Sequence, residues 1–195
     1  MKGKQLAKLI GTLCVMGVVI LGVYLALHTQ EDDGTFAKDG TANTEAQAIL
    51  AKDVARNYPA NQREVVRLFA RISKCFYNEK ISEEEFHDLI EMQRMLFDEE
   101  LLEENPLEDF TARLSLEIEN AKKTETTMVN YRVQKQSSVA DWPYGEDSLA
   151  SIIASFTMKG EKYTKSYEEF LLREDEKGNW KIVGWRLTDP VEIED

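Results

Sequence analysis

The feature that most constrains the fold is a change in the spacing of apolar residues near Lys123. Before this point apolar residues recur every three or four positions, as they do along one side of an α-helix. After it they alternate with polar residues, which is typical of a strand with one buried face. Helices followed by a run of strands predict an α+β domain in which the helices pack on one face of the sheet.

The helical half contains four helix starts with a capping signature. In this signature an N-cap side chain and an acid or amide three residues later satisfy two backbone amides. The pairs are Thr44 with Gln47, Asn61 with Glu64, Ser82 with Glu85, and Asn105 with Glu108, the last followed by Pro106 at a first helical position. We predict helices over about 45–57, 62–77, 83–97 and 107–122. The acidic run DEELLEE, residues 98–104, is interpreted as a solvated helix end.

The second half contains four alternating runs, which we predict to be strands. They are TTMVNYRVQ (126–134), SIIASFTM (151–158), YTKSYEEFLLRE (163–174) and WKIVGWRL (180–187). Glycine-containing turns between such runs indicate antiparallel hairpins. Residues 137–147, SSVADWPYGED, are predicted to form a long loop. The expected domain is therefore cone-like, with about four helices packed on a curved antiparallel sheet of about four strands.

The chain begins with a long uncharged segment over residues 9–27. At about 1.5 Å per residue it just spans a hydrocarbon core of about 30 Å. Lys2, Lys4 and Lys8 precede it and Glu31 follows it, which places the N-terminus in the cytoplasm and the remainder outside. The alternative is a cleaved signal peptide, but the run is long and YLALHTQ lacks an A-x-A pattern, so an uncleaved anchor is favoured. We predict a cytoplasmic basic tail (1–8), a transmembrane signal anchor (9–28), a flexible stalk (29–43) and an extracytoplasmic domain (44–195).

The charge of the chain is strongly acidic. The formal net charge is -12, and the part after the predicted anchor is more acidic still because three of the cations precede the anchor. Such a domain repels phosphate backbones, so the composition argues against nucleic-acid binding.

One helix nevertheless carries a row of cations: Arg63, Arg67, Arg71 and Lys74. On a helical projection this row lies opposite an apolar stripe, so we expect it to point away from any pocket in the domain. Either carboxylates of a neighbouring helix pair with it, or it is a positive strip available to an anionic partner or the lipid surface. Pairing is favoured, because exposed charges are usually solvated or paired.

Catalytic and metal-binding patterns are missing from the sequence. The chain has two histidines, His28 and His87, and no C-x-x-C, H-E-x-x-H, Walker or dinucleotide-binding motif. Cys14 and Cys75 fall on different sides of the predicted membrane boundary, so no disulfide is expected, and Cys75 is predicted to be a small core residue. We therefore predict no cofactor and no metal.

Three segments carry a resemblance to a known family. They are NYPANQREVVRLFARISKCFYNEK (57–80), FDEELLEENPLEDF (97–110) and YEEFLLREDEKGNWKIVGWRL (167–187). They resemble an uncharacterised family of single-pass envelope proteins from Gram-positive bacteria whose extracytoplasmic domain is nuclear-transport-factor-two-like, or cystatin-like. The resemblance implies a fold that can enclose an apolar pocket between the helices and the sheet.

Some members of that fold superfamily place an Asp base and a Tyr donor in this pocket. By residue type the resemblance implies Tyr131, Asp141 and Trp185 as pocket candidates, but core packing is the favoured interpretation of Tyr131 and Trp185. The expected function is a membrane-anchored extracytoplasmic interaction or scaffold module without catalysis. Its partners would be membrane lipid through residues 9–28 and an envelope protein or a second copy of the chain. The alternative is a small-molecule-binding domain or enzyme that uses the apolar pocket.

Overall fold

The computed structural model describes residues 44–193, and the predicted tail, anchor and stalk lie outside this range. The described chain is an α+β domain of five α-helices followed by a five-stranded antiparallel sheet. The helices are α2 (Glu45–Leu50), α3 (Gln62–Asn78), α4 (Glu83–Arg94), α5 (Glu99–Glu104) and α6 (Leu107–Lys123). The strands are β1 (Thr127–Val133), β2 (Ala140–Tyr144), β3 (Asp147–Lys159), β4 (Tyr163–Glu174) and β5 (Trp180–Leu187), with a 3-10 turn η1 (Gln136–Ser138) after β1. No helix within residues 44–193 is long and apolar enough to cross a membrane.

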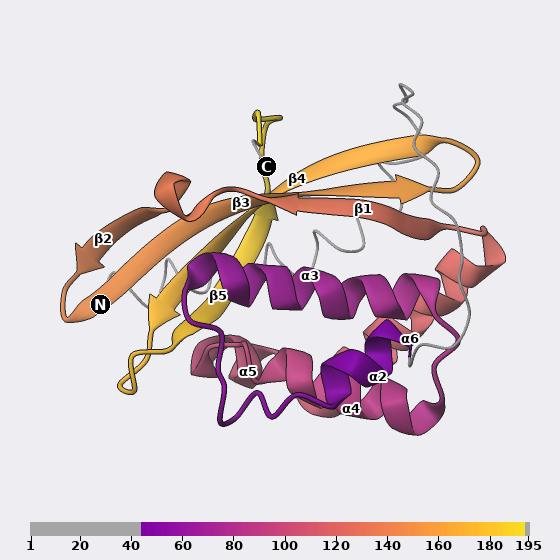
Figure 1. Cartoon of the computed structure of the whole chain (residues 1–195), viewed down its shortest axis with the longest axis horizontal. Coiled ribbons are helices and arrows are strands. Elements are labelled where there is room, and N and C mark those ends of the chain that lie inside the picture. Colours follow the sequence, from indigo (N-terminus) through magenta and orange to yellow (C-terminus); the bar gives the residue numbers. More distant parts are fainter. Residues whose placement is uncertain (1–43, 194–195) are drawn as a thin grey trace.

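The sheet runs in the order β1-β3-β4-β5, and β2 also pairs with β3. Strand β1 pairs with the second half of β3, residues 154–159, whereas β2 pairs with its first part, residues 147–151. These two short strands therefore follow each other along one edge of the sheet, and β5 forms the opposite edge (Figure 1).

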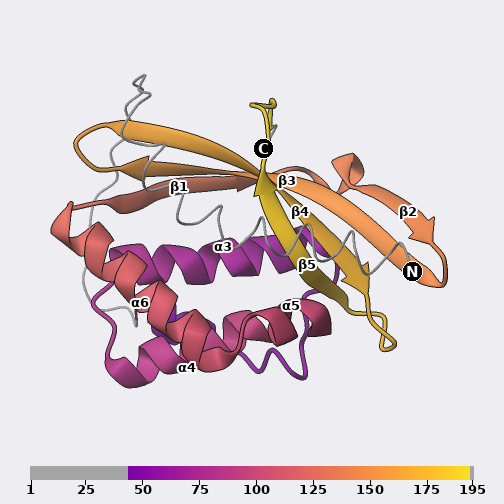
Figure 2. The same cartoon turned by 180° about the vertical axis from the view of Figure 1, so that it is seen from behind.

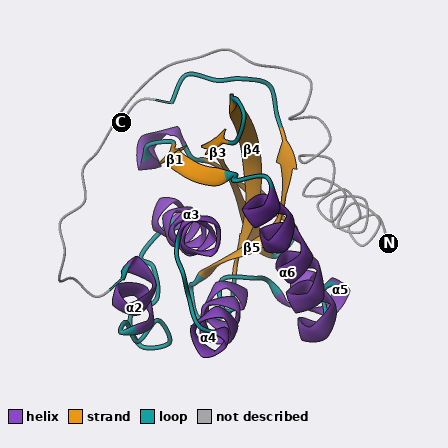
Figure 3. Cartoon of the chain, turned by 90° about the vertical axis from the view of Figure 1, so that its right-hand side faces the viewer, coloured by secondary structure: helices purple, strands orange, loops and turns teal. Residues whose placement is uncertain are grey.

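All of the helices lie on one face of the sheet (Figures 1 and 2). Helix α3 is the closest to the strands, contacts β1, β3 and β5, and separates them from α2 and α4 (Figure 3). Its apolar face is fully buried at Val65 and Ile72 and nearly so at Phe76. Because α3 runs beside β1, its polar flank lies at the edge of the sheet and not on the far side of the molecule.

The predicted helix caps are confirmed at three positions and wrong at the fourth. Thr44, Asn61 and Ser82 each accept a hydrogen bond from the backbone N–H three residues later. Asn105 does not cap α6, whose N-cap is Pro106. The Asn105 side chain instead donates to Leu101 O, back along the preceding helix, because Asn105 is the C-cap of α5.

Two predicted helices are shorter than their apolar patterns indicate. The first ends at Leu50 and not near residue 57. The third ends at Arg94, and residues 99–104, interpreted above as its solvated end, form the separate helix α5 with Asp98 as N-cap. Between the two helices, Phe97 forms a parallel bridge with Ile182 of β5. Pairing with the edge of the sheet thus draws this segment out of helical geometry.

The predicted long loop over 137–147 contains a strand, β2, which forms a hairpin with β3. Every residue of β2 is exposed, so no apolar alternation marks the strand in the sequence. Its backbone is nevertheless paired from Ala140 to Tyr144. The sheet therefore has one more strand than the sequence predicts.

Candidate functional site: a basic groove beside strand β1

Aromatic side chains occupy the space between the helices and the sheet, where the resemblance allows an apolar pocket. Trp185 packs against Phe69, with ring centroids 5.1 Å apart, and against Phe170 at 5.7 Å. Phe97 joins this cluster, 6.1 Å from Trp185, and Phe110 lies 5.7 Å from Phe97. The side chains of α3, α6 and the sheet thus fill the inner face of the strands, and Trp185 belongs to this packing.

The three predicted pocket residues do not come together. Asp141 is an exposed residue of β2 and pairs with Ala150 of β3. Tyr131 pairs with Phe156, which lies on β3 six residues beyond Ala150. Six residues of a strand span about 20 Å, so Tyr131 and Asp141 lie about that far apart along β3. Trp185 lies on β5, beyond β4 from both of them. The tyrosine and the aspartate therefore cannot act on one small substrate.

A groove of about 360 Å³ lies between α3 and β1. It is lined by Arg63, Arg67 and Lys74 of the helix and by Asn130, Tyr131, Arg132 and Val133 of the strand. Four of these lining residues are cations, and none of them carries a carboxylate. The groove thus joins one predicted pocket residue to three residues of the predicted partner surface. The expectation that the basic row points away from any pocket is wrong, because α3 lies at the edge of the sheet.

Two cations of the row hold the backbone beside β1. Arg63 Nε donates to Gln134 O at 3.0 Å, and Lys74 Nζ donates to Val129 O at 3.3 Å. These contacts fix both ends of the groove along the strand. They also show that α3 and β1 run antiparallel to each other.

Three cations of the row pair with carboxylates, because Arg63, besides its bond to Gln134 O, lies 3.7 Å from Glu64. Arg67 forms an ion pair with Glu64 of the same helix at 3.0 Å, and both side chains remain about two-fifths exposed. Arg71 Nε donates to Glu45 Oε1 of α2 at 2.8 Å. Arg71 thus has the partner from a neighbouring helix that the sequence predicts, and it does not line the groove.

Tyr131, one of the residues that line the groove, is half-buried. Burial raises the pKa of its hydroxyl, and the positive charges of Arg71 and Arg67 partly oppose this shift. The side chain therefore stays a neutral hydrogen-bonding group beside cations. This position suits recognition of an anion better than proton abstraction, which needs a tyrosine with a depressed pKa.

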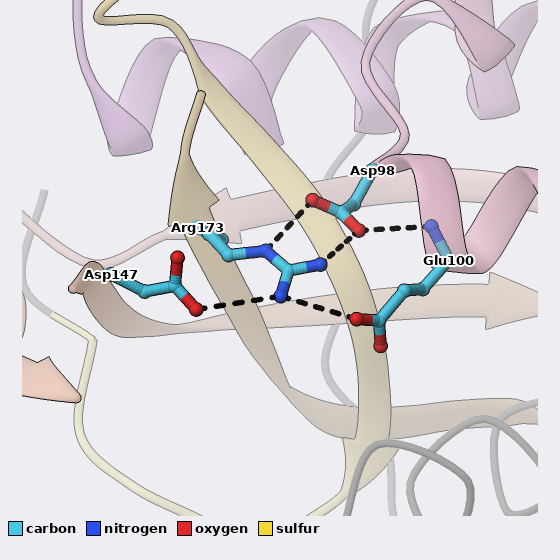
Figure 4. A network of polar contacts seen from close by, with 4 residues as sticks. All are labelled: Asp98, Glu100, Asp147 and Arg173. Atoms are coloured by element: carbon cyan, nitrogen blue, oxygen red, sulfur yellow. Dashed lines mark hydrogen bonds and ion pairs between the residues drawn. The ribbon is translucent and has the colours of Figure 1, made fainter. Parts of the chain in front are cut away.

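A second polar cluster surrounds Arg173 of β4 (Figure 4). Its guanidinium forms a bidentate pair with Asp98, with Nε 3.0 Å from Oδ2, and lies 3.3 Å from Glu100 and 3.7 Å from Asp147. The pKa of Arg173 is raised, first by its hydrogen bonds to Asp98. Asp98 also accepts from the N–H of Glu100 as the α5 N-cap. The cluster is a structural tie between α5, β3 and β4.

A third cluster, formed by Tyr77, Glu117 and Glu168, joins α3, α6 and β4, and sequence reasoning missed it. The Tyr77 hydroxyl donates to Glu117 Oε1. Burial, and then the charge of Glu117, raises the pKa of Glu168 to about 7. Burial also raises the pKa of Glu117, against the hydrogen bond from Tyr77. Strand parity could have found Glu168, because it lies on the same face of β4 as the buried Ser166 and Phe170.

The fold and these sites define an α+β domain with a filled interior and a cationic groove at one edge of its sheet. Residues 1–185 match a domain of unknown function, DUF6715, and the chain belongs to that family. No curated protein matches the chain.

Proposed function

We propose that this chain is a membrane-anchored protein-interaction module that binds an anionic partner in the groove between α3 and β1. One observation carries the proposal: in a chain with a formal net charge of -12, four of the described residues that line one groove are cations, and none of the described lining residues carries a carboxylate. Charge complementarity of this kind increases association rates and selects partners.

The filled interior favours this proposal over the small-molecule alternative. An enzyme of the cone-like class needs an open pocket, and here aromatic rings from α3, α6, the segment between α4 and α5, and two strands take that space. The groove is shallow and open to solvent, as expected for a surface that another macromolecule covers.

The proposed place of the domain follows from the N-terminal segment. Residues 9–28 act as an uncleaved single-pass anchor, with residues 1–8 in the cytoplasm and residues 44–195 outside as a nuclear-transport-factor-two-like domain of an envelope protein. The partner is then an envelope protein or another copy of the chain. Protease treatment of intact cells tests this orientation, and we expect digestion of the domain without lysis.

Site-specific crosslinking in the native envelope tests the docking surface. A photo-crosslinking amino acid in place of Asn130, which lines the groove, should give a discrete adduct heavier than the chain. The same amino acid in place of Leu116, an exposed residue of α6, is the control and should give none. The adduct from position 130 should weaken when Arg63 and Arg67 are both replaced by Gln. An adduct of equal yield from both positions, or one that ignores the two arginines, would overturn the proposal.

A further inference from the structure

The outer edge of β1 carries backbone groups that the sheet does not use. Within residues 44–193, strand β1 pairs with β3 alone, and Gln134, just past its end, donates its N–H to Ile153 O. In an antiparallel ladder the bonded residues alternate, so the N–H and C=O groups of Tyr131 and Val133 point away from β3. No described residue outside the sheet bonds to the backbone of these two residues.

Side chains of α3 close both ends of this edge. At one end Asn78 Nδ2 donates to Met128 O at 2.8 Å, and Met128 N donates to Asn78 Oδ1 at 2.9 Å. At the other end Arg63 Nε donates to Gln134 O. The edge is thus open over Asn130–Val133, and this same stretch lines the groove.

The spacing of the cations matches that of a strand. Arg63 and Arg67 are one helical turn apart, a rise of about 6 Å, and alternate residues of a strand are about 6.6 Å apart. Because α3 runs alongside β1, a strand added to β1 would direct every second side chain toward this row.

We propose that the groove takes an extended peptide segment with acidic residues at alternate positions, which pairs as an additional strand with the outer edge of β1. The backbone of the segment bonds to Tyr131 and Val133, and its carboxylates meet Arg63 and Arg67. This inference rests on the proposed docking function and adds the chemistry of the partner. Main-chain pairing supplies affinity in this mode, and the charges supply selectivity.

Binding of synthetic peptides to the purified full-length chain tests the inference. The probe is a fluorescein-labelled TEVEVET peptide, measured by fluorescence anisotropy at low salt. An analogue with Gln in place of each Glu tests charge, and we expect it to bind at least about tenfold more weakly because charge-assisted hydrogen bonds are lost. Arg67→Gln should weaken binding of the acidic peptide by about tenfold. Arg186→Gln is the matched control, since it removes the same charge from an exposed ion pair on β5, at the opposite edge of the sheet, and it should change binding less than about twofold.

Backbone methylation tests strand pairing separately from charge. An extended peptide presents the N–H groups of odd and even residues on opposite edges, so two peptides are made, each methylated on one set of alternate amides. We expect one of these peptides to lose binding by at least about tenfold and the other to keep it. Equal binding by both, or no binding by the unmethylated acidic peptide, would overturn the inference. Neither result contradicts the proposed docking function, which is tested by the crosslinking comparison of positions 130 and 116 and by its dependence on the two arginines.

Discussion

At each edge of the sheet, one residue uses both its backbone N–H and its C=O in hydrogen bonds to a group outside the sheet. The group differs between the two edges. At β5, Ile182 N donates to Leu96 O at 2.7 Å and Asp98 N donates to Ile182 O at 2.9 Å, so a backbone segment covers the strand. At β1, the side-chain amide of Asn78 takes the place of that peptide segment beside Met128. A side chain satisfies one residue only, so the rest of the β1 edge depends on Lys74 and Arg63 and stays open between them.

The edges also differ in how charge is balanced. Beside β5, Arg173 is surrounded by three carboxylates, and its contacts tie the covering segment in place. Beside β1, cations outnumber carboxylates among the residues of the groove. Unpaired backbone edges invite a further strand, and proteins usually blunt them with charges. A row of positive charges beside a partly open edge instead favours binding of a segment that carries negative charges.

Replacing Arg173 should have the largest effect, because it removes the tie at the β5 edge. Arg173→Met leaves Asp98, whose side chain is only 9% exposed, without its counter-ion. Breaking a buried pair in this way costs about 3 kcal/mol of unfolding free energy, measurable by urea denaturation. The control is Arg186→Met, which removes an exposed pair with Glu169 and should cost less than about 1 kcal/mol. Equal losses in the two variants would contradict the difference that we draw between the β5 edge and ordinary surface pairs.

The next effect concerns the interior between the two edges, where Glu117 and Glu168 carry like charges. Since the folded state raises the pKa of Glu168 to about 7, it binds more protons than the unfolded state between pH 4.5 and 7. Stability from this group is therefore lost as the pH rises through that range. Glu168→Gln should remove this dependence and raise the unfolding free energy at pH 8 by about 2 kcal/mol. Glu169→Gln, one residue further on the opposite face of β4, is the control and should give no gain. A wild-type stability that rises from pH 5 to pH 7 by a Glu168-dependent amount would contradict the assignment.

A smaller effect is expected at the β1 edge itself. Asn78→Ala removes two hydrogen bonds from the backbone of Met128, at a cost of about 1–2 kcal/mol. Hydrogen exchange should locate the change, with faster exchange at the Met128 amide and no change at Ile182. The control is Asn120→Ala on α6, which should stay within about 0.5 kcal/mol. If the Met128 amide stayed protected, the side-chain amide would not be what closes this edge.

The smallest effect on stability is expected within the groove. Arg67→Gln removes an exposed ion pair with Glu64 and should change the unfolding free energy by less than about 0.5 kcal/mol. Thermal and urea unfolding of Arg67→Gln and Arg71→Gln should be nearly the same. A large loss in Arg67→Gln alone would make the groove a stabilising feature of the fold, and its charges would then need no partner to account for them.

Much of the fold is predictable from local patterns. The apolar stripes place α3 and α6 within one or two residues, and alternation gives the bounds of β4 and β5 as the structure has them. The predictions that were wrong, for β2 and for the end of α4, share one cause. Strand β2 is defined by backbone pairing with β3 and not by an apolar face, and α4 and α5 are separated by pairing of Phe97 with Ile182. Both interactions join residues far apart in the chain, which periodicity cannot detect.

The candidate site divides in the same way. The residue types of the basic row are visible in the sequence, and so is Tyr131, but the two belong to separate predictions there. Only the packing of α3 along β1 brings them together in one groove. Strand parity places Glu168 on the same face of β4 as Ser166 and Phe170, but only the packing of α6 against the domain brings it near Glu117.

The sequence by itself determined the α+β class, the order of helices before strands, three helix caps and the acidic balance, because each depends on neighbouring residues or on composition. The tertiary structure decided which edge of the sheet is covered by backbone, that the basic row of α3 lies beside β1, and that aromatic rings fill the interior. These features depend on how the elements dock, and docking is set by shape and pairing between segments that no local pattern connects.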